Sequence, residues 1–71
     1  MERRYAYNYA QIDPTNNMCI GVVTTDDPRQ GEIAGWVEIP VYDEDYLAKY
    51  YINGEWYEDA AGTIPWTSSL I

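Results

Sequence analysis

The side chains in this sequence that could do chemistry are carboxylates and one thiol. Acids adjoin one another at residues 26–27 and 43–45, Cys19 is the single cysteine, and histidine is absent. Calcium takes about six to eight oxygen ligands from a loop with spaced acids, and neither acidic run has that spacing. Without histidine, a Ser/His/Asp triad and a Cys/His zinc site are both excluded. We therefore interpret both acidic runs as solvated turns and expect no enzyme, no metal and no cofactor.

Aromatic rings offer a second kind of chemistry, the binding of a partner or ligand. The chain has eight Tyr, three Trp and no Phe, and such rings suit surfaces that are dry in a complex and wet outside it. Rings can stack on a nucleotide base while an arginine binds its phosphate, and a symmetric oligomer would multiply the few basic residues at a shared pocket. Alternatively, the rings fill the core and the arginines pair with carboxylates. The candidate contact residues are Tyr5, Tyr7, Tyr9, Arg29, Trp36, Tyr51, Trp56 and Trp66.

The segment KYYINGEWYED, residues 49–59, predicts a β-hairpin. Asn53 and Gly54 tolerate the positive φ angles of a type I′ turn, whose twist matches that of the strands it joins. A two-residue loop also fixes which residues face each other. The expected pairs are Lys49 with Glu58, Tyr50 with Tyr57, Tyr51 with Trp56, and Ile52 with Glu55.

The first third of the chain predicts another hairpin. Residues 5–12 alternate tyrosine with smaller side chains, and the turn DPTNN follows at residues 13–17. Residues 18–25 (MCIGVVTT) are apolar and β-branched on both faces, which is typical of a central strand. Gly21 within this strand predicts a bulge or a close aromatic neighbour. Cys19 is predicted to be a buried, inert thiol.

The remaining segments connect these hairpins and end the chain. Residues 26–35 predict the longest loop. Residues 36–41 predict a strand that lies at a sheet edge or ends at Pro40, because Pro40 cannot donate to a ladder. Residues 42–47 predict one helical turn, which Asp43 could cap, or a tight bend. Residues 60–71 form either a disordered end or an extended arm. We favour an arm that docks on its own domain or on a neighbour, because an apolar end with Trp66 is costly to leave in water.

Together these patterns predict a mostly β fold. We expect a small antiparallel sheet of about five strands, made of two hairpins and a linking strand, with one short helical turn. Residues 1–59 would form a single small domain and residues 60–71 an extended C-terminal arm, docked or flexible. A chain of 71 residues has little surface to bury, and one cysteine allows no internal disulfide. Self-association or docking on a larger partner is therefore the expected source of further stability.

Charge and hydropathy narrow the choice of partners. The chain carries twelve acidic and four basic residues, for a net charge of −8. This balance argues against binding a nucleic-acid backbone or an anionic membrane. The acidic surface either keeps the protein soluble or meets a basic partner. No apolar run approaches the ~20 residues of a membrane span, the N-terminus lacks the apolar region of a secretion signal, and a single free cysteine fits a reducing cytosol.

An ordered series of short motifs resembles a class of short proteins and fibre-end modules from tailed bacteriophages. The series is YAYNYAQID, NNMCIGVV, VEIP, YDEDYL and KYYINGEWYED, and it covers about residues 5–59. The resemblance implies a virion-associated tail or fibre module, or a small accessory protein encoded nearby, with no catalytic residues. Phage fibres of this kind are commonly trimeric. Residues 26–35 and the Trp66 arm are not part of the pattern.

Two hypotheses of function follow. The first is a non-enzymatic structural or interaction module of a phage tail or fibre, which forms a homo-oligomer and contacts another phage or host protein. The alternative is a phage anti-defence inhibitor. It would bind a host defence protein through its acidic surface, or sequester a nucleotide immune signal at an aromatic, arginine-lined subunit interface. The protein would then lie in the virion or in the host cytoplasm.

Overall fold

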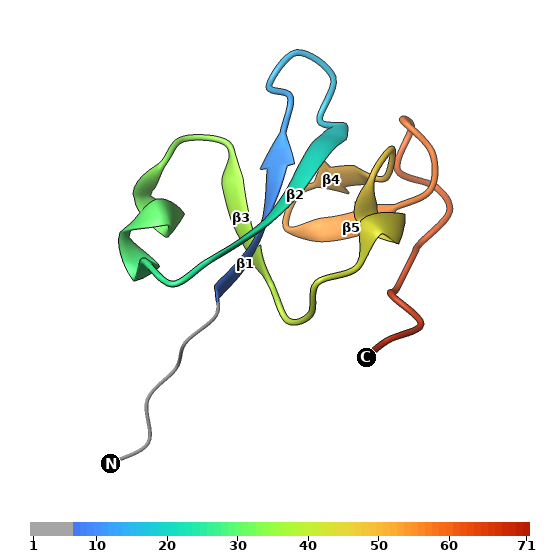
Figure 1. The fold of residues 1–71 in the computed structure, drawn as a ribbon. Helices are drawn as coiled ribbons and strands as arrows, with labels where there is room; N and C mark the ends of the chain where they lie inside the picture. The colour runs from blue at the N-terminus through green and yellow to red at the C-terminus, as the bar shows by residue number, and fades with distance from the viewer. Residues whose placement is uncertain (1–6) are drawn as a thin grey trace.

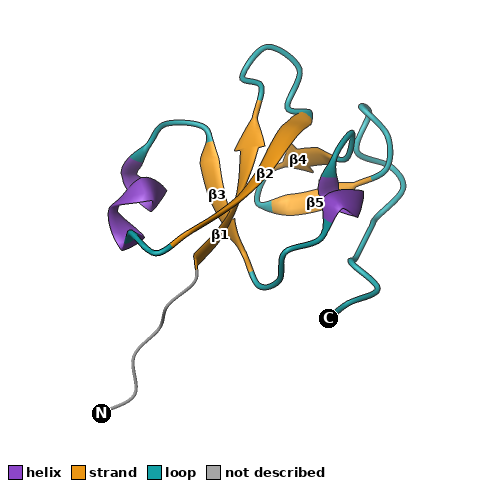
Figure 2. Ribbon diagram, viewed as in Figure 1, coloured by secondary structure: helices purple, strands orange, loops and turns teal. Residues whose placement is uncertain are grey.

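The computed structural model describes residues 7–71, which form five strands in two antiparallel sheets (Figure 1). This confirms the predicted mostly β fold, and the strands divide between a three-stranded sheet of order β2-β1-β3 and a two-stranded sheet β4-β5. No α-helix occurs between residues 7 and 71; the helical segments are two short 3-10 turns (Figure 2). The elements are β1 (Tyr7–Ile12), β2 (Cys19–Thr25), η1 (Pro28–Glu32), β3 (Trp36–Ile39), η2 (Glu44–Tyr46), β4 (Tyr50–Ile52) and β5 (Glu55–Tyr57).

The central strand of the larger sheet is β1, so the prediction that residues 18–25 form a central strand was wrong. β2 lies at one edge and β3 at the other. Ala10 of β1 faces Val22 of β2 and Val37 of β3, and it is completely buried. Because alanine is small, the second layer can approach the sheet closely at its middle strand. β2 is apolar although it lies at an edge: Cys19 is its one buried residue, and the others are half-buried or exposed.

A β-bulge interrupts the β1–β2 ladder, as Gly21 predicted. Gln11 faces Gly21 and Ile12 faces Cys19, so Ile20 has no partner on β1 and is 58% exposed. A Cβ atom at Gly21 would lie 2.1 Å from the side-chain oxygen of Gln11. The close neighbour of Gly21 is thus an amide side chain, and of the two predicted alternatives the bulge is the one that the structure shows.

The second hairpin has the predicted turn and register. Asn53 and Gly54 have φ angles of 52° and 82°, as a type I′ turn requires. The ladder joins Ile52 with Glu55 and the two aromatic pairs beyond them, and it ends before the expected Lys49–Glu58 pair. The helical turn predicted after residue 42 is η2, where the Asp45 amide donates to the Asp43 carboxylate at 2.9 Å.

The two faces of the larger sheet are covered by different segments, as Figure 1 shows. The β4–β5 hairpin and η2 lie on one side. On the other side, the predicted loop of residues 26–35 contains η1, which lies near Tyr9, since a Cβ at Gly31 would be 3.2 Å from the Tyr9 hydroxyl. β3 lies at an edge of the sheet and ends at Ile39, directly before Pro40, so the predictions from Pro40 are confirmed, while the strand is two residues shorter than the predicted range of 36–41.

The core lies between the larger sheet and η2. Its buried members are Ala10, Cys19, Ile39 and Tyr46, and the half-buried side chains packed on them include both Trp56 and Trp66. Cys19 is 1% exposed, so its predicted burial is confirmed, and this burial raises the pKa of its thiol. Tyr46 is the largest fully buried side chain. A helical turn of three residues therefore supplies the centre of the core.

Replacing Tyr46 by alanine should destabilise the protein by about 3–5 kcal/mol, because it removes a buried ring and leaves a cavity. A chain of this size has a free energy of unfolding of roughly 4–11 kcal/mol, so this loss would be a large part of it. The matched control is Tyr42→Ala, because Tyr42 is 45% exposed; its effect should be within about 0.5 kcal/mol. Urea unfolding followed by tryptophan fluorescence measures both. Equal effects of the two substitutions would contradict this description of the core.

Candidate functional site

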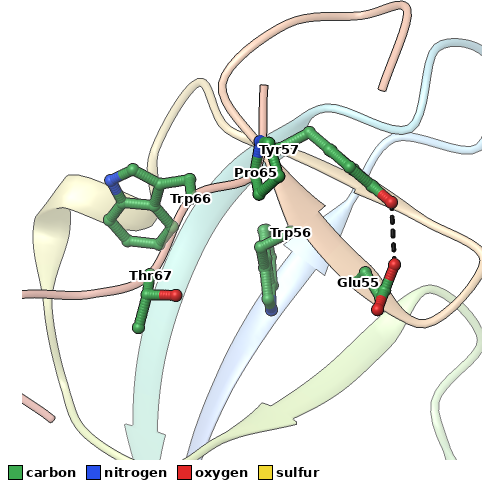
Figure 3. A pocket seen from close by; sticks show the side chains of 6 residues that line it. All are labelled: Glu55, Trp56, Tyr57, Pro65, Trp66 and Thr67. Carbon is green, nitrogen blue, oxygen red and sulfur yellow. Dashed lines mark hydrogen bonds between the residues drawn. The ribbon is translucent and has the colours of Figure 1, made fainter. Parts of the chain in front are cut away.

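The C-terminal segment, residues 60–71, runs beside β5 and forms a concave surface with it. Tyr57 and Pro65 form an antiparallel bridge. The Glu58 amide donates to the Ile64 carbonyl at 2.8 Å, and the Trp66 amide donates to the Trp56 carbonyl at 3.0 Å. The resulting pocket of about 340 Å³, which we call the aromatic groove, is lined by Glu55, Trp56, Tyr57, Pro65, Trp66 and Thr67 (Figure 3).

The ring of Tyr46 positions both indoles of the aromatic groove. Its centroid lies 4.8 Å from that of Trp56 and 4.8 Å from that of Trp66, with interplanar angles of 70° and 80°. Such edge-to-face pairs each stabilise by about 0.5–1.5 kcal/mol beyond burial. Tyr51 packs on Trp56 at 5.0 Å, and the Lys49 ammonium lies 4.9 Å from the Trp66 ring. The two tryptophans are therefore held in place without a ligand.

A buried hydrogen bond fastens the end of the C-terminal segment. The Ser68 hydroxyl donates to the Asp43 carboxylate across 25 positions of sequence. Ser68 is 3% exposed and Asp43 is 7% exposed. Ser68 also accepts a hydrogen bond from the Leu70 amide at 3.1 Å. The hydrogen bond from Ser68, together with that from the Asp45 amide, lowers the pKa of Asp43, because both favour the charged carboxylate.

A second carboxylate shapes the turn that leads into this segment. Asp59 accepts hydrogen bonds from the Thr63 amide at 2.9 Å, from the Thr63 hydroxyl and from the Ile64 amide at 2.9 Å. These donors lower the pKa of Asp59, the Thr63 hydroxyl most of all. Gly62 in the same turn has a φ of +70°, a conformation that glycine adopts without steric cost. The turn thus directs residues 64–67 back along β5.

The rim of the aromatic groove is acidic. Glu55 is exposed, and its Oε2 atom accepts a hydrogen bond from the Tyr57 hydroxyl at 2.8 Å. This bond raises the pKa of Tyr57, because it favours the protonated phenol. None of the six lining side chains is basic. In Figure 3, Trp66 and Thr67 lie on one side of the groove and Glu55 and Tyr57 on the other. The groove therefore combines apolar walls with one negative charge.

The structure brings together only some of the predicted contact residues. Tyr51, Trp56 and Trp66 meet around Tyr46. Tyr9 and Trp36 form a separate pair at 5.9 Å, and Tyr9 is on the face of β1 opposite to buried Ala10. Tyr7 is half-buried near the start of β1. Tyr5 lies outside the described residues.

Arg29 lies away from the aromatic groove, in η1. Its guanidinium donates to both carboxylate oxygens of Asp27, each at 3.0 Å, and this partner raises the pKa of Arg29. The arrangement matches the expected alternative, in which an arginine pairs with one of the abundant carboxylates. Sequence reasoning did not identify Glu55, Tyr57, Pro65 and Thr67 as groove residues, nor Tyr46 and Ser68 as their supports.

Between residues 7 and 71, no group of three or more metal-binding side chains is arranged to hold a metal ion. Over the same part of the chain, no helix is long and apolar enough to cross a membrane.

Comparison of the sequence with protein-family models, with curated proteins and with solved structures gave no significant match.

Replacing Ser68 by alanine should lower the melting temperature at neutral pH. It should also reduce the fall in melting temperature that occurs when the solution is acidified. The folded-state pKa of Asp43 is below its ordinary value of 3.8, so this group stabilises the fold above that pH and loses the effect as pH falls through the folded pKa. The difference in melting temperature between the natural protein and Ser68→Ala should therefore shrink below about pH 4. Circular dichroism measures the difference from neutral pH to about pH 2.

The exposed neighbour Ser69 provides the matched control. Ser69→Ala should leave both the melting temperature and its pH dependence as they are in the natural protein. Other carboxylates also titrate, but they do so in all three proteins and therefore cancel in the difference. A difference for Ser68→Ala that stays constant down to the lowest pH would contradict the assignment of Asp43 as its partner.

Proposed function

We propose that the chain is a non-enzymatic interaction module, encoded by a tailed bacteriophage and associated with its tail or fibre. In this proposal it forms a homo-oligomer and binds another phage or host protein. The phage origin and the virion location rest on the series of sequence motifs over residues 5–59. The observation that supports the interaction role is the aromatic groove. Its two tryptophan side chains are held in position by the ring of Tyr46.

The groove supports a binding role because it leaves apolar ring surface in contact with water, which is unfavourable until a partner covers it. Trp56, Tyr57 and Trp66 are only half-buried, and Pro65 and Thr67 are exposed. Tryptophan and tyrosine dominate the energetics of many protein interfaces, where they fill pockets that exclude water. A pre-arranged pair of indoles also reduces the entropy lost on binding. We therefore assign contact with the partner protein to this groove.

A different surface supports self-association. The outer edge of Val22–Thr25 in β2 is not paired with another strand of residues 7–71. Edge strands attract further strands unless charges, Pro or a bulge protects them. The bulge of β2 lies at Ile20, before this stretch, and the valines and threonines that follow include no charged residue or proline. At the opposite edge, β3 carries Glu38 and ends before Pro40. We therefore place the contact between copies at β2.

The anti-defence alternative stays a hypothesis. A nucleotide site would need a basic side chain beside exposed rings, and Arg29 pairs with Asp27 instead of lining the aromatic groove. The basic side chain beside a ring of the groove is Lys49, 4.9 Å from Trp66, and its ammonium already donates to the Asp45 carbonyl at 3.1 Å.

Thr24→Lys tests the self-association surface. The natural protein should have the mass of an oligomer by light scattering at micromolar concentration, and Thr24→Lys should shift it toward the monomer, because a charge on an edge strand opposes pairing. Thr24 is exposed, so its replacement should leave the fold intact.

The matched control is Thr67→Lys, which makes the same change of charge in the aromatic groove and should leave the mass unaltered. A monomeric natural protein, or equal masses for Thr24→Lys and the natural protein, would contradict the proposed assembly.

A further inference from the structure

The size of the aromatic groove limits what it can hold. Its volume of about 340 Å³ is at the small end of the ~300–1,000 Å³ typical of ligand pockets. The groove follows β5 and the C-terminal segment, which run side by side at the surface. A short length of extended chain fits this shape, whereas a folded element such as a helix requires a wider surface.

The lining side chains suit proline better than other residues of an extended chain. Two indoles, a tyrosine ring and the Pro65 ring form the walls, and aromatic-lined grooves recognise polyproline II segments because these are already ordered before binding. A polyproline II chain makes no internal hydrogen bonds. Its carbonyl oxygens can therefore accept hydrogen bonds from indole N–H groups, which are donors only.

Charge determines the second feature of the occupant. Glu55 is the one charged residue of the lining. Its Oε2 atom accepts from the Tyr57 hydroxyl, which fixes the carboxylate at the rim, and a carboxylate has room for further donors. The whole chain has a net charge of −8, so a basic segment is attracted and an acidic one is repelled.

We propose that the aromatic groove binds an extended, proline-containing segment of another protein, with an arginine or lysine of that segment placed against Glu55. The prolines pack between the two indoles, and the basic side chain pairs with the Glu55 carboxylate. This inference rests on the proposed function, because it specifies the chemistry of the partner that contacts the same groove.

Other occupants fit the groove less well. A polyanion or a nucleotide phosphate would meet the negative charge of Glu55 without a basic side chain in the lining. A second copy of this chain would bring a net charge of −8 to a groove whose one charged residue is acidic, and the contact between copies is proposed at β2 instead. The described chain also shows one cation already placed on an indole, Lys49 on Trp66, which illustrates the affinity of these rings for positive charge.

The test is a titration of the full chain with a short synthetic peptide of prolines with an arginine at each end. Tryptophan fluorescence should change and saturate, because the indoles form the site. A peptide with glutamates in place of the arginines and a peptide with alanines in place of the prolines should each bind at least about tenfold more weakly. No saturable change with the first peptide, or equal affinity for all three, would overturn the proposal.

Two pairs of variants locate the binding. Glu55→Gln should weaken the arginine–proline peptide by roughly threefold to fivefold, the effect of losing one exposed ion pair, whereas Glu58→Gln, an equal charge change outside the groove lining, should not. Thr67→Lys should weaken binding at least about tenfold, whereas Thr24→Lys should not. Binding that is unaffected by Glu55→Gln and Thr67→Lys would place the peptide elsewhere and refute the inference. The mass of Thr24→Lys tests the self-association separately, so a failure of either proposal can be recognised.

Discussion

The ring of Tyr46 contacts the indoles of both Trp56 and Trp66, at 4.8 Å from each, and most of the structure depends on this arrangement. Tyr46 belongs to η2, Trp56 to β5 and Trp66 to the C-terminal segment, so one side chain joins three separate parts of the chain. The Asp43–Ser68 hydrogen bond adds a second connection between η2 and that segment. The aromatic groove exists because these contacts hold the segment beside β5, with one side of each indole exposed.

The local signals in the sequence predicted the strands well, because each depends on a few adjacent residues. The Asn53-Gly54 turn fixed a hairpin, Pro40 marked a strand end, and Asp43 capped a helical turn. The order of strands was harder to predict. The apolar pattern of β2 resembles that of a central strand, but the central strand is β1, in which Ala10 is completely buried. This property depends on contacts between layers, which no periodicity encodes.

The candidate site was predicted only in part, for a similar reason. The half-buried rings Tyr51, Trp56 and Trp66 were identified by residue type, and they do lie together. Their supports were missed because they act over long distances in sequence: Ser68 bonds to Asp43 across 25 positions. A short pattern in which Asp59 precedes Thr63 by four residues does signal the turn that starts the C-terminal segment. Nothing in the local sequence indicates where that segment then packs.

The most direct measurement is a solution NMR spectrum of the full chain that records cross-relaxation between aromatic ring protons. Centroid distances of 4.8 Å place edge protons within range of detection, so this account predicts cross-peaks from Tyr46 to both Trp56 and Trp66, with ring-current shifts for the Trp66 signals. A Trp66 indole with the shifts of an unstructured peptide and no contact to Tyr46 would contradict it. In that case the C-terminal segment would not form the groove, and the binding site inferred from it would not exist.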